Sequence, residues 1–310
     1  MSKSLCELIA TSRTPEGVLP RHFCLPREES SKGPAFADGA LDGITMYHTA
    51  PAFLNSPDKK ELGRLITLAA DGSYSEAEEG FAAFCEEHRA LVIIDDLQKY
   101  IVNHERKLDP DALFEFAVNM LLESGDRECV KVALSILELF DVYDNDALAD
   151  TIRIVGLSDE FTLFSAYLMR SWPQAEEELL ELAKRVRGWG RVHCVDLMTA
   201  ENEETRKWLF FNGVDNDVMP AYSAWAVYDK ARVEEIIERE DLSYEEIHAI
   251  LMLTEGLMDE GPVSGLSRMN KPREYLKKVL EKFESYKGDE GFSWEEEDEL
   301  VIKAIRERLE

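Results

Sequence analysis

The stretch RGWGRVHCVDLM, residues 187–198, places His193 directly before Cys194, two side chains that can serve as base and nucleophile. A catalytic pair of this kind is normally assembled from segments that are distant in sequence and meet in the fold. Neighbours on a helix point about 100° apart, so these two side chains cannot reach one substrate atom together. We therefore interpret the stretch as a glycine turn leading into a buried helix, and we assign no catalytic residue.

A second group that could do chemistry is Asp38, Asp42 and His48, within FADGALDGITMYH, residues 36–48. Carboxylates and imidazoles are suitable ligands for hard or borderline metal ions, so these side chains could converge on a ligand or a metal. Their spacing matches no recognised ligand motif, and we assign no metal and no cofactor. The alternative is that this segment caps the open apolar face of a helical array.

Aromatic and basic side chains extend the possible site. Tryptophans recur through the centre of the chain, where they could line a concave groove or pack between helices. Arg191, His193 and Asp196 could form a polar patch, because residues three or four apart share a helix face. The predicted ligand-binding residues are Asp38, Asp42, His48, Trp189, Arg191, His193 and Trp225.

From about residue 56 onward, helix start and stop signals dominate. Proline suits the first turn of a helix and glycine its end, and three segments begin and end in this way: Ser56–Pro57 to Gly72, Asp109–Pro110 to Gly125, and Pro173 to Gly188. Capping boxes are predicted at Ser75 with Glu78, Ser243 with Glu246 and Ser293 with Glu296, and Asn202 is a predicted cap.

The apolar spacing between these signals is helical. The segment 173–186 has one apolar stripe, typical of an outer helix, whereas 128–140 and 161–172 are apolar around most of their circumference and predict buried inner helices. Placing Leu137, Leu168, Leu197 and Trp225 in register gives intervals of 31, 29 and 28 residues. A helical hairpin of this length cannot bury its own apolar face, so successive hairpins are expected to stack.

The segment from about residue 75 to 240 resembles the short HEAT-type repeats of α-solenoid proteins in pattern and length. Such repeats often carry an aspartate in the turn and an arginine in the second helix. Asp144 and Asp159 lie near such turns, but no regular arginine ladder follows them. The resemblance implies an all-α fold, an α-α superhelix of the HEAT/ARM-like solenoid type, with an irregular N-terminal arm.

Two motifs together, FADGALDGITMYH and GWGRVHCVDLM, resemble a group of bacterial proteins that have sometimes been labelled limonene hydroxylase. We do not carry that activity over to this chain. The sequence has no glycine-rich fingerprint for a flavin, and no cysteine lies in a context that suggests a haem-thiolate ligand.

The two ends differ from the centre. Residues 1–55 are rich in proline and glycine, contain one β-like run from Ile44 to His48, and predict an irregular arm or cap. Residues 56–310 predict a helical-repeat domain, with the clearest repeats at about 110–240 and terminal capping helices in 272–310.

Composition limits the partners. A net charge of −28 over 310 residues disfavours binding to nucleic acid or to anionic membrane surfaces. The sequence has neither a signal peptide nor a transmembrane segment, so we expect a cytoplasmic protein with reduced cysteines.

The function predicted from these features is non-catalytic binding or scaffolding. A solenoid surface would recognise a protein or peptide, and the acidic field favours a basic one; self-association is left open. The alternative is a small-molecule or metal-dependent ligand-binding protein or enzyme that uses an Asp/His/Trp-lined pocket between arm and solenoid.

Overall fold

The computed structural model describes residues 3–26, 36–49, 57–261, 263–288 and 293–310. These residues form α helices joined by turns and loops, with one short 3-10 helix and no β strand among them. The prediction of an all-α fold is confirmed. Across these residues, no helix has both the length and the apolar character that a membrane span requires.

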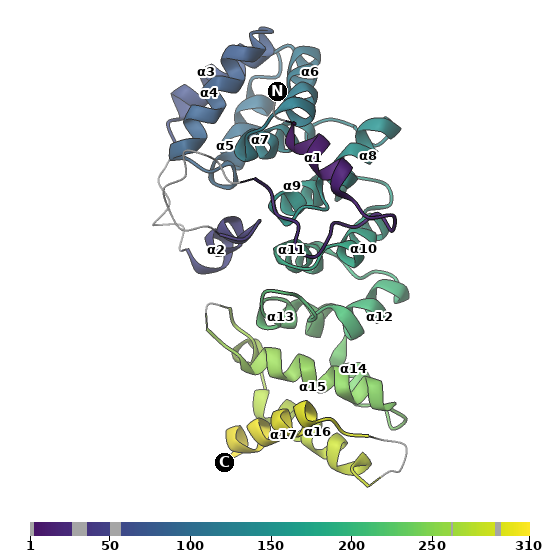
Figure 1. Ribbon diagram of the computed structural model, residues 1–310. Coiled ribbons are helices and arrows are strands. Elements are labelled where there is room, and N and C mark those ends of the chain that lie inside the picture. Colours follow the sequence, from purple (N-terminus) through teal and green to yellow (C-terminus); the bar gives the residue numbers. More distant parts are fainter. Residues whose placement is uncertain (1–2, 27–35, 50–56, 262, 289–292) are drawn as a thin grey trace. The chain divides into compact units, whose positions relative to one another are not determined.

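The chain divides into two compact units, Met1–Cys194 and Val195–Glu310, each described here by itself (Figure 1). The first unit contains α1 (Leu5–Ser12), α2 (Ala40–His48), α3 (Lys59–Ala70), α4 (Tyr74–Glu87), α5 (Ala90–Asn103), α6 (Pro110–Glu123), α7 (Arg127–Leu137), α8 (Asp146–Val155), α9 (Asp159–Met169), α10 (Ala175–Arg185) and the first part of α11 (Trp189–Leu197). The second contains α12 (Glu203–Asn212), α13 (Ala221–Lys230), α14 (Val233–Ile237), α15 (Tyr244–Met258), the 3-10 helix (Leu266–Arg268), α16 (Pro272–Tyr286) and α17 (Glu296–Leu309). The predicted arm boundary at residues 55 and 56 lies outside the described residues.

Several helices begin where capping chemistry predicts. Asp109 caps α6 and Asn202 caps α12, each by accepting hydrogen bonds from backbone N–H groups of the first turn. Ser243 and Glu246 form the reciprocal capping box of α15. Replacing such a cap by alanine typically costs about 1 kcal/mol of helix stability.

Two predicted capping boxes are wrong. Ser75 lies inside α4, because the helix already begins at Tyr74 after the turn that Gly72 makes with a φ of 81°. At α17 the cap is Glu295, whose backbone N–H donates to the fully buried Asp298 carboxylate, and not Ser293. The spacing S-x-x-E is present at both places, but the surrounding chain sets a different starting residue.

Helices α7 and α9 are the buried inner helices that the sequence predicted. Every side chain of α7 from Cys129 to Leu137 is buried, and α7 packs against α4, α5, α6 and α9. Helix α10 buries one stripe of leucines and leaves its four glutamates exposed or partly exposed, as an outer helix does. In the first unit α3 packs on α5, α5 on α7 and α7 on α9; in the second α13 packs on α15 and α15 on α17.

The N-terminal segment differs from its prediction. Instead of an irregular arm with a β-like run at Ile44–His48, its described residues form two helices, and that run is the second half of α2. Helix α1 packs against α6 and α8. Burial of one face of α2, which includes Ala40 and Gly43, overrides the strand preference of the β-branched residues on its other side.

Candidate functional site

Helix α2 carries one of the predicted site residues, Asp42, into the core of the first unit, where only 2% of its side chain is exposed. Its Oδ1 accepts a hydrogen bond from the Arg89 guanidinium at 2.7 Å, and its Oδ2 accepts one from Lys131 Nζ at 2.7 Å. Burial alone would raise the pKa of Asp42, but the two cations outweigh it and hold the pKa below its ordinary value. Asp42 is therefore an ionised, fully paired carboxylate.

Lys131 is the centre of this arrangement. It lies on α7 with no exposed side-chain surface, and its Nζ lies 2.7 Å from Asp42, 2.9 Å from Glu128 and 2.5 Å from Glu160. Burial alone would lower the pKa of Lys131, but the three carboxylates raise it above its ordinary value. The ammonium group therefore stays charged and cannot serve as a base near neutral pH.

Asp38, four residues before Asp42, is paired with a single cation, and its burial raises its pKa. Its carboxylate accepts hydrogen bonds from Arg127 Nη1 at 2.9 Å and from the backbone N–H of Leu25 at 2.9 Å. Glu160 accepts from the same arginine at 3.2 Å and from the backbone N–H of Gly39 at 2.9 Å, directly before α2. These ion pairs connect α2 and the residues before it to α5, α7 and α9. The charged cluster is defined as Asp38, Asp42, Arg89, Arg127, Glu128, Lys131 and Glu160.

His193 and Trp189 lie beside this cluster. The His193 ring is fully buried and stacks against Tyr47 of α2 and against Trp189, with centroid distances of 6.3 and 6.1 Å. Burial lowers the pKa of His193 to about 4, an effect that the negative charge of Asp42 opposes, so the ring is neutral at pH 7. Neither ring nitrogen has a hydrogen-bond partner among the described residues.

The remaining predicted residues lie elsewhere. Arg191 is buried and donates to the backbone carbonyls of Ala183 and Val186, so it closes the C-terminal end of α10. His48 is the exposed last residue of α2. Trp225 belongs to the second unit, where the Arg268 guanidinium lies 4.3 Å from its ring centroid.

The structure therefore brings together Asp38, Asp42, Trp189 and His193, but the two carboxylates are already paired with cations of the chain. Each carboxylate of the cluster already faces a lysine or an arginine. No group of three or more His, Cys, Asp and Glu side chains within the described ranges is placed to hold a metal ion. A buried ionic network of this kind can position a helix, but none of its anions is free to bind a cationic ligand.

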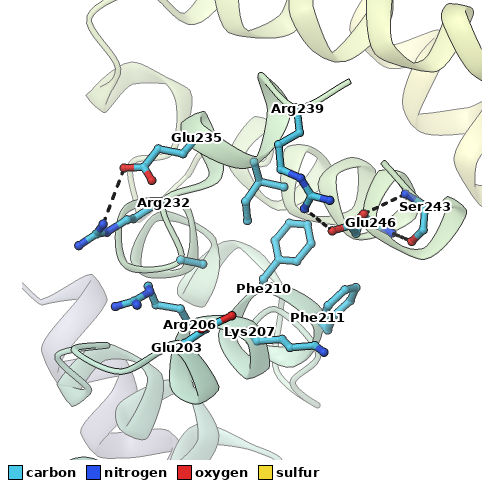
Figure 2. Close-up of a pocket in the computed structure, with 12 residues that line it drawn as sticks. Glu203, Arg206, Lys207, Phe210, Phe211, Arg232, Glu235, Arg239, Ser243 and Glu246 are labelled. Carbon is cyan, nitrogen blue, oxygen red and sulfur yellow. Dashed lines mark hydrogen bonds and ion pairs between the residues drawn. The ribbon is translucent and has the colours of Figure 1, made fainter. Parts of the chain in front are cut away.

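The second unit contains an open pocket of about 610 Å³ (Figure 2). Helix α12 forms one wall, and the segment from Ala231 through α14 to the first turn of α15 forms the other. The pocket is lined by Glu203, Arg206, Lys207, Phe210, Phe211, Ala231, Arg232, Glu235, Ile236, Arg239, Ser243 and Glu246. Four cationic and three acidic side chains give this lining a net positive charge in a strongly acidic chain.

The four cations of the pocket differ in how they are paired. Arg239 donates to Glu246 at 2.6 Å, a carboxylate that also closes the capping box of α15. Arg232 lies 3.9 Å from Glu235, with 60% of its side chain exposed. Arg206 donates to two backbone carbonyls and has no carboxylate partner among the described residues. Lys207 is exposed and forms neither an ion pair nor a hydrogen bond with the described residues.

Two aromatic side chains contribute to the apolar surface of the pocket, together with Ala231 and Ile236. Phe210 is buried, whereas 39% of Phe211 is exposed, and their ring centroids lie 4.9 Å apart in an edge-to-face arrangement. In Figure 2, Phe210 points from α12 into the space below Arg239. Large exposed apolar side chains next to unpaired cations are typical of surfaces that bind other molecules.

None of the site residues predicted from the sequence lines this pocket. The only local signal is the run TRKWLFFN, residues 205–212, in which two adjacent cations precede two adjacent phenylalanines by four positions. That spacing places Arg206 with Phe210 and Lys207 with Phe211 along the same face of a helix. The opposite wall comes from residues about 25 to 40 positions later, and the sequence alone does not indicate that these walls face each other.

Comparisons with protein families, with curated proteins and with solved structures found no match to this chain.

Proposed function

We propose that this chain is a helical-repeat binding module of the HEAT-like solenoid kind, and that the pocket of the second unit holds a segment of a protein partner. The packing of each inner helix on the next inner helix, α3 to α9 in one unit and α13 to α17 in the other, supports the solenoid assignment. Solenoids characteristically bind extended segments along their surfaces.

The observation that carries this proposal is the exposed face of Phe211 beside the unpaired Lys207 in an open pocket. When a partner covers an exposed phenylalanine, the complex is stabilised by roughly 25 cal/mol for each Å² of apolar surface removed from water. A binding role is favoured over catalysis because this lining contains no cysteine or histidine, and its one hydroxyl side chain, Ser243, caps α15.

A second candidate is the predicted small-ligand or metal-dependent function near α2. The unpartnered ring nitrogens of the buried His193 favour it, because buried polar groups normally have partners. Thermal unfolding with a panel of metabolites and metal ions would test it. A ligand that stabilises the native chain but not His193→Phe would support this candidate, whereas no stabilising ligand would count against it.

The main proposal is tested by selecting peptides from a random display library on the full-length chain. The selected pool is then measured against two variants that each replace an exposed apolar side chain of the second unit by serine. Phe211→Ser removes the aromatic face of the pocket, and Leu300→Ser, at a side chain 59% exposed on α17, is the matched control.

We expect the pool to bind the native chain and Leu300→Ser equally and to bind Phe211→Ser at least about tenfold more weakly, because the central apolar contact is lost. Failure to enrich any peptide would contradict the proposal. Equal binding to both serine variants would place the peptides elsewhere and would contradict it as well.

A further inference from the structure

The charges of the pocket indicate which partner segment it takes. We propose that the pocket recognises an acidic peptide segment in which an aspartate or glutamate lies next to a large apolar side chain. This inference rests on the proposed function and adds the chemistry of the bound segment. It is the opposite of the basic partner that the net charge of −28 favours, because the local lining carries the opposite sign.

Three cations remain available to an incoming carboxylate. Lys207 has no polar partner among the described residues, and Arg206 faces only the carbonyls of Ala200 and Glu201. Arg232 is 60% exposed, and its contact with Glu235 at 3.9 Å is at the limit of an ion pair. Exposed ion pairs of this length contribute little to stability, so a well-placed peptide carboxylate can compete for this arginine.

The aromatic side chains define the apolar half of the motif. Lys207 and Phe211 are four residues apart on α12, and so are Arg206 and Phe210, so each cation lies one turn before a phenylalanine. A peptide that covers the exposed face of Phe211 with an apolar side chain brings the next side chain close to Lys207. An acidic residue at that position gains an ion pair, whereas a basic residue there is repelled.

The acidic side chains of the lining restrict the ligand further. Glu203 and Glu235 also line the pocket; Glu235 is paired only through its 3.9 Å contact with Arg232, and Glu203 forms no ion pair with the described residues. Lys207 is the one cation of the lining without a polar partner among the described residues, so it can neutralise one carboxylate, whereas a phosphate with a charge of about −1.5 to −2 leaves excess negative charge beside Glu203 and Glu235. Nucleic acid is disfavoured for the same reason and by the acidity of the whole chain. The lining therefore fits a carboxylate-bearing peptide better than a phosphorylated or nucleic-acid ligand.

The test uses the composition of the selected peptides and two charge reversals in the full-length chain. Lys207→Glu reverses a pocket cation. Lys277→Glu makes the same change at an exposed lysine of α16, which lies outside the pocket and forms no ion pair with the described residues, and it keeps the net charge of the two variants equal. Affinities are measured by fluorescence anisotropy of labelled peptides from the pool.

We expect the enriched peptides to carry aspartate or glutamate next to an apolar residue, and to bind Lys207→Glu about tenfold more weakly than Lys277→Glu. Changing the acidic residue to its amide should produce a similar loss on the native chain. A poly-dT oligonucleotide and a phosphoserine version of the peptide should bind more weakly than the parent peptide.

The outcomes separate this inference from the proposed function. A pool that loses affinity for Phe211→Ser but is neutral or basic in composition overturns the inference and leaves the binding function standing. Tighter binding of the oligonucleotide or of the phosphoserine peptide also overturns it, in favour of that ligand class. A pool that is indifferent to Phe211→Ser overturns both.

Discussion

The charged cluster of the first unit and the pocket of the second are built from the same kinds of residue, arginine, lysine, glutamate and aromatic side chains, but they differ in how the charges are paired. In the cluster, Lys131 contacts three carboxylates and is fully buried. In the pocket, Lys207 is exposed and contacts none among the described residues. The comparison teaches that residue type alone does not identify a binding site; the pairing and burial of each charge decide whether it stabilises the fold or remains available to a partner.

The largest expected difference is between the two lysines. Lys131→Met should lower the free energy of unfolding of the first unit by about 3–5 kcal/mol, because it leaves Asp42, Glu128 and Glu160 with one buried cation fewer. Lys207→Met should change stability by at most about 0.5 kcal/mol. Urea unfolding of both variants, followed by far-ultraviolet circular dichroism, measures the difference. Equal effects would mean that the cluster does not hold the first unit together.

The second prediction concerns pH. The pKa of His193 is about 4 in the folded chain and near 6.5 when it is unfolded and exposed. Below pH 6.5 the His193 ring therefore binds a proton in the unfolded chain, whereas in the folded chain it stays neutral until the pH approaches 4. The contribution of His193 to stability is complete above that pH and is lost as the pH falls toward 4. Between pH 7 and pH 5 the loss should be roughly 2 kcal/mol.

The matched variant for this prediction is His193→Phe, which keeps an aromatic ring between Tyr47 and Trp189 but cannot titrate. Other acidic groups contribute equally to both chains, so the difference between their unfolding curves at pH 7 and pH 5 isolates the histidine. Parallel pH dependence in the two chains would show that His193 is not buried as the structure has it.

The third prediction concerns the contact between α2 and α11. A side chain at Gly43 would meet the Trp189 ring, so Gly43→Ala should cost about 1–3 kcal/mol through overpacking. Gly125→Ala is the control, because a methyl group there meets nothing within 4 Å. Hydrogen exchange should also become faster in α2 of the first variant alone. Unchanged exchange and stability in both variants would contradict the tight docking of α2.

Sequence reasoning predicted the parts of the fold that depend on local chemistry. The caps at Asp109, Asn202 and Ser243 require only residues within one helical turn, and the inner helices follow from continuous apolar runs. Helix α2 was missed because its conformation is fixed by burial against distant residues such as Trp189, which outweighs the strand preference of its own side chains.

The candidate sites show the same limit. Asp38, Asp42, Trp189 and His193 were predicted as one group and do lie together, but their cationic partners were not anticipated. The single lysine within the apolar run VKVALSIL, Lys131, indicates a buried ion pair, because a lysine on a buried helix needs a carboxylate partner. That partner lies 89 positions away for Asp42, a distance over which a single sequence gives no information about contact.

The most direct test of the account is the affinity of the selected peptides for Lys207→Glu relative to Lys277→Glu, with the unfolding curves of both variants measured beside it. We expect binding to be about tenfold weaker for the pocket variant and the unfolding curves of the two variants to be indistinguishable. Equal affinity for the two variants would contradict the claim that the unpaired charges of the second unit, and not the paired charges of the first, form the binding site.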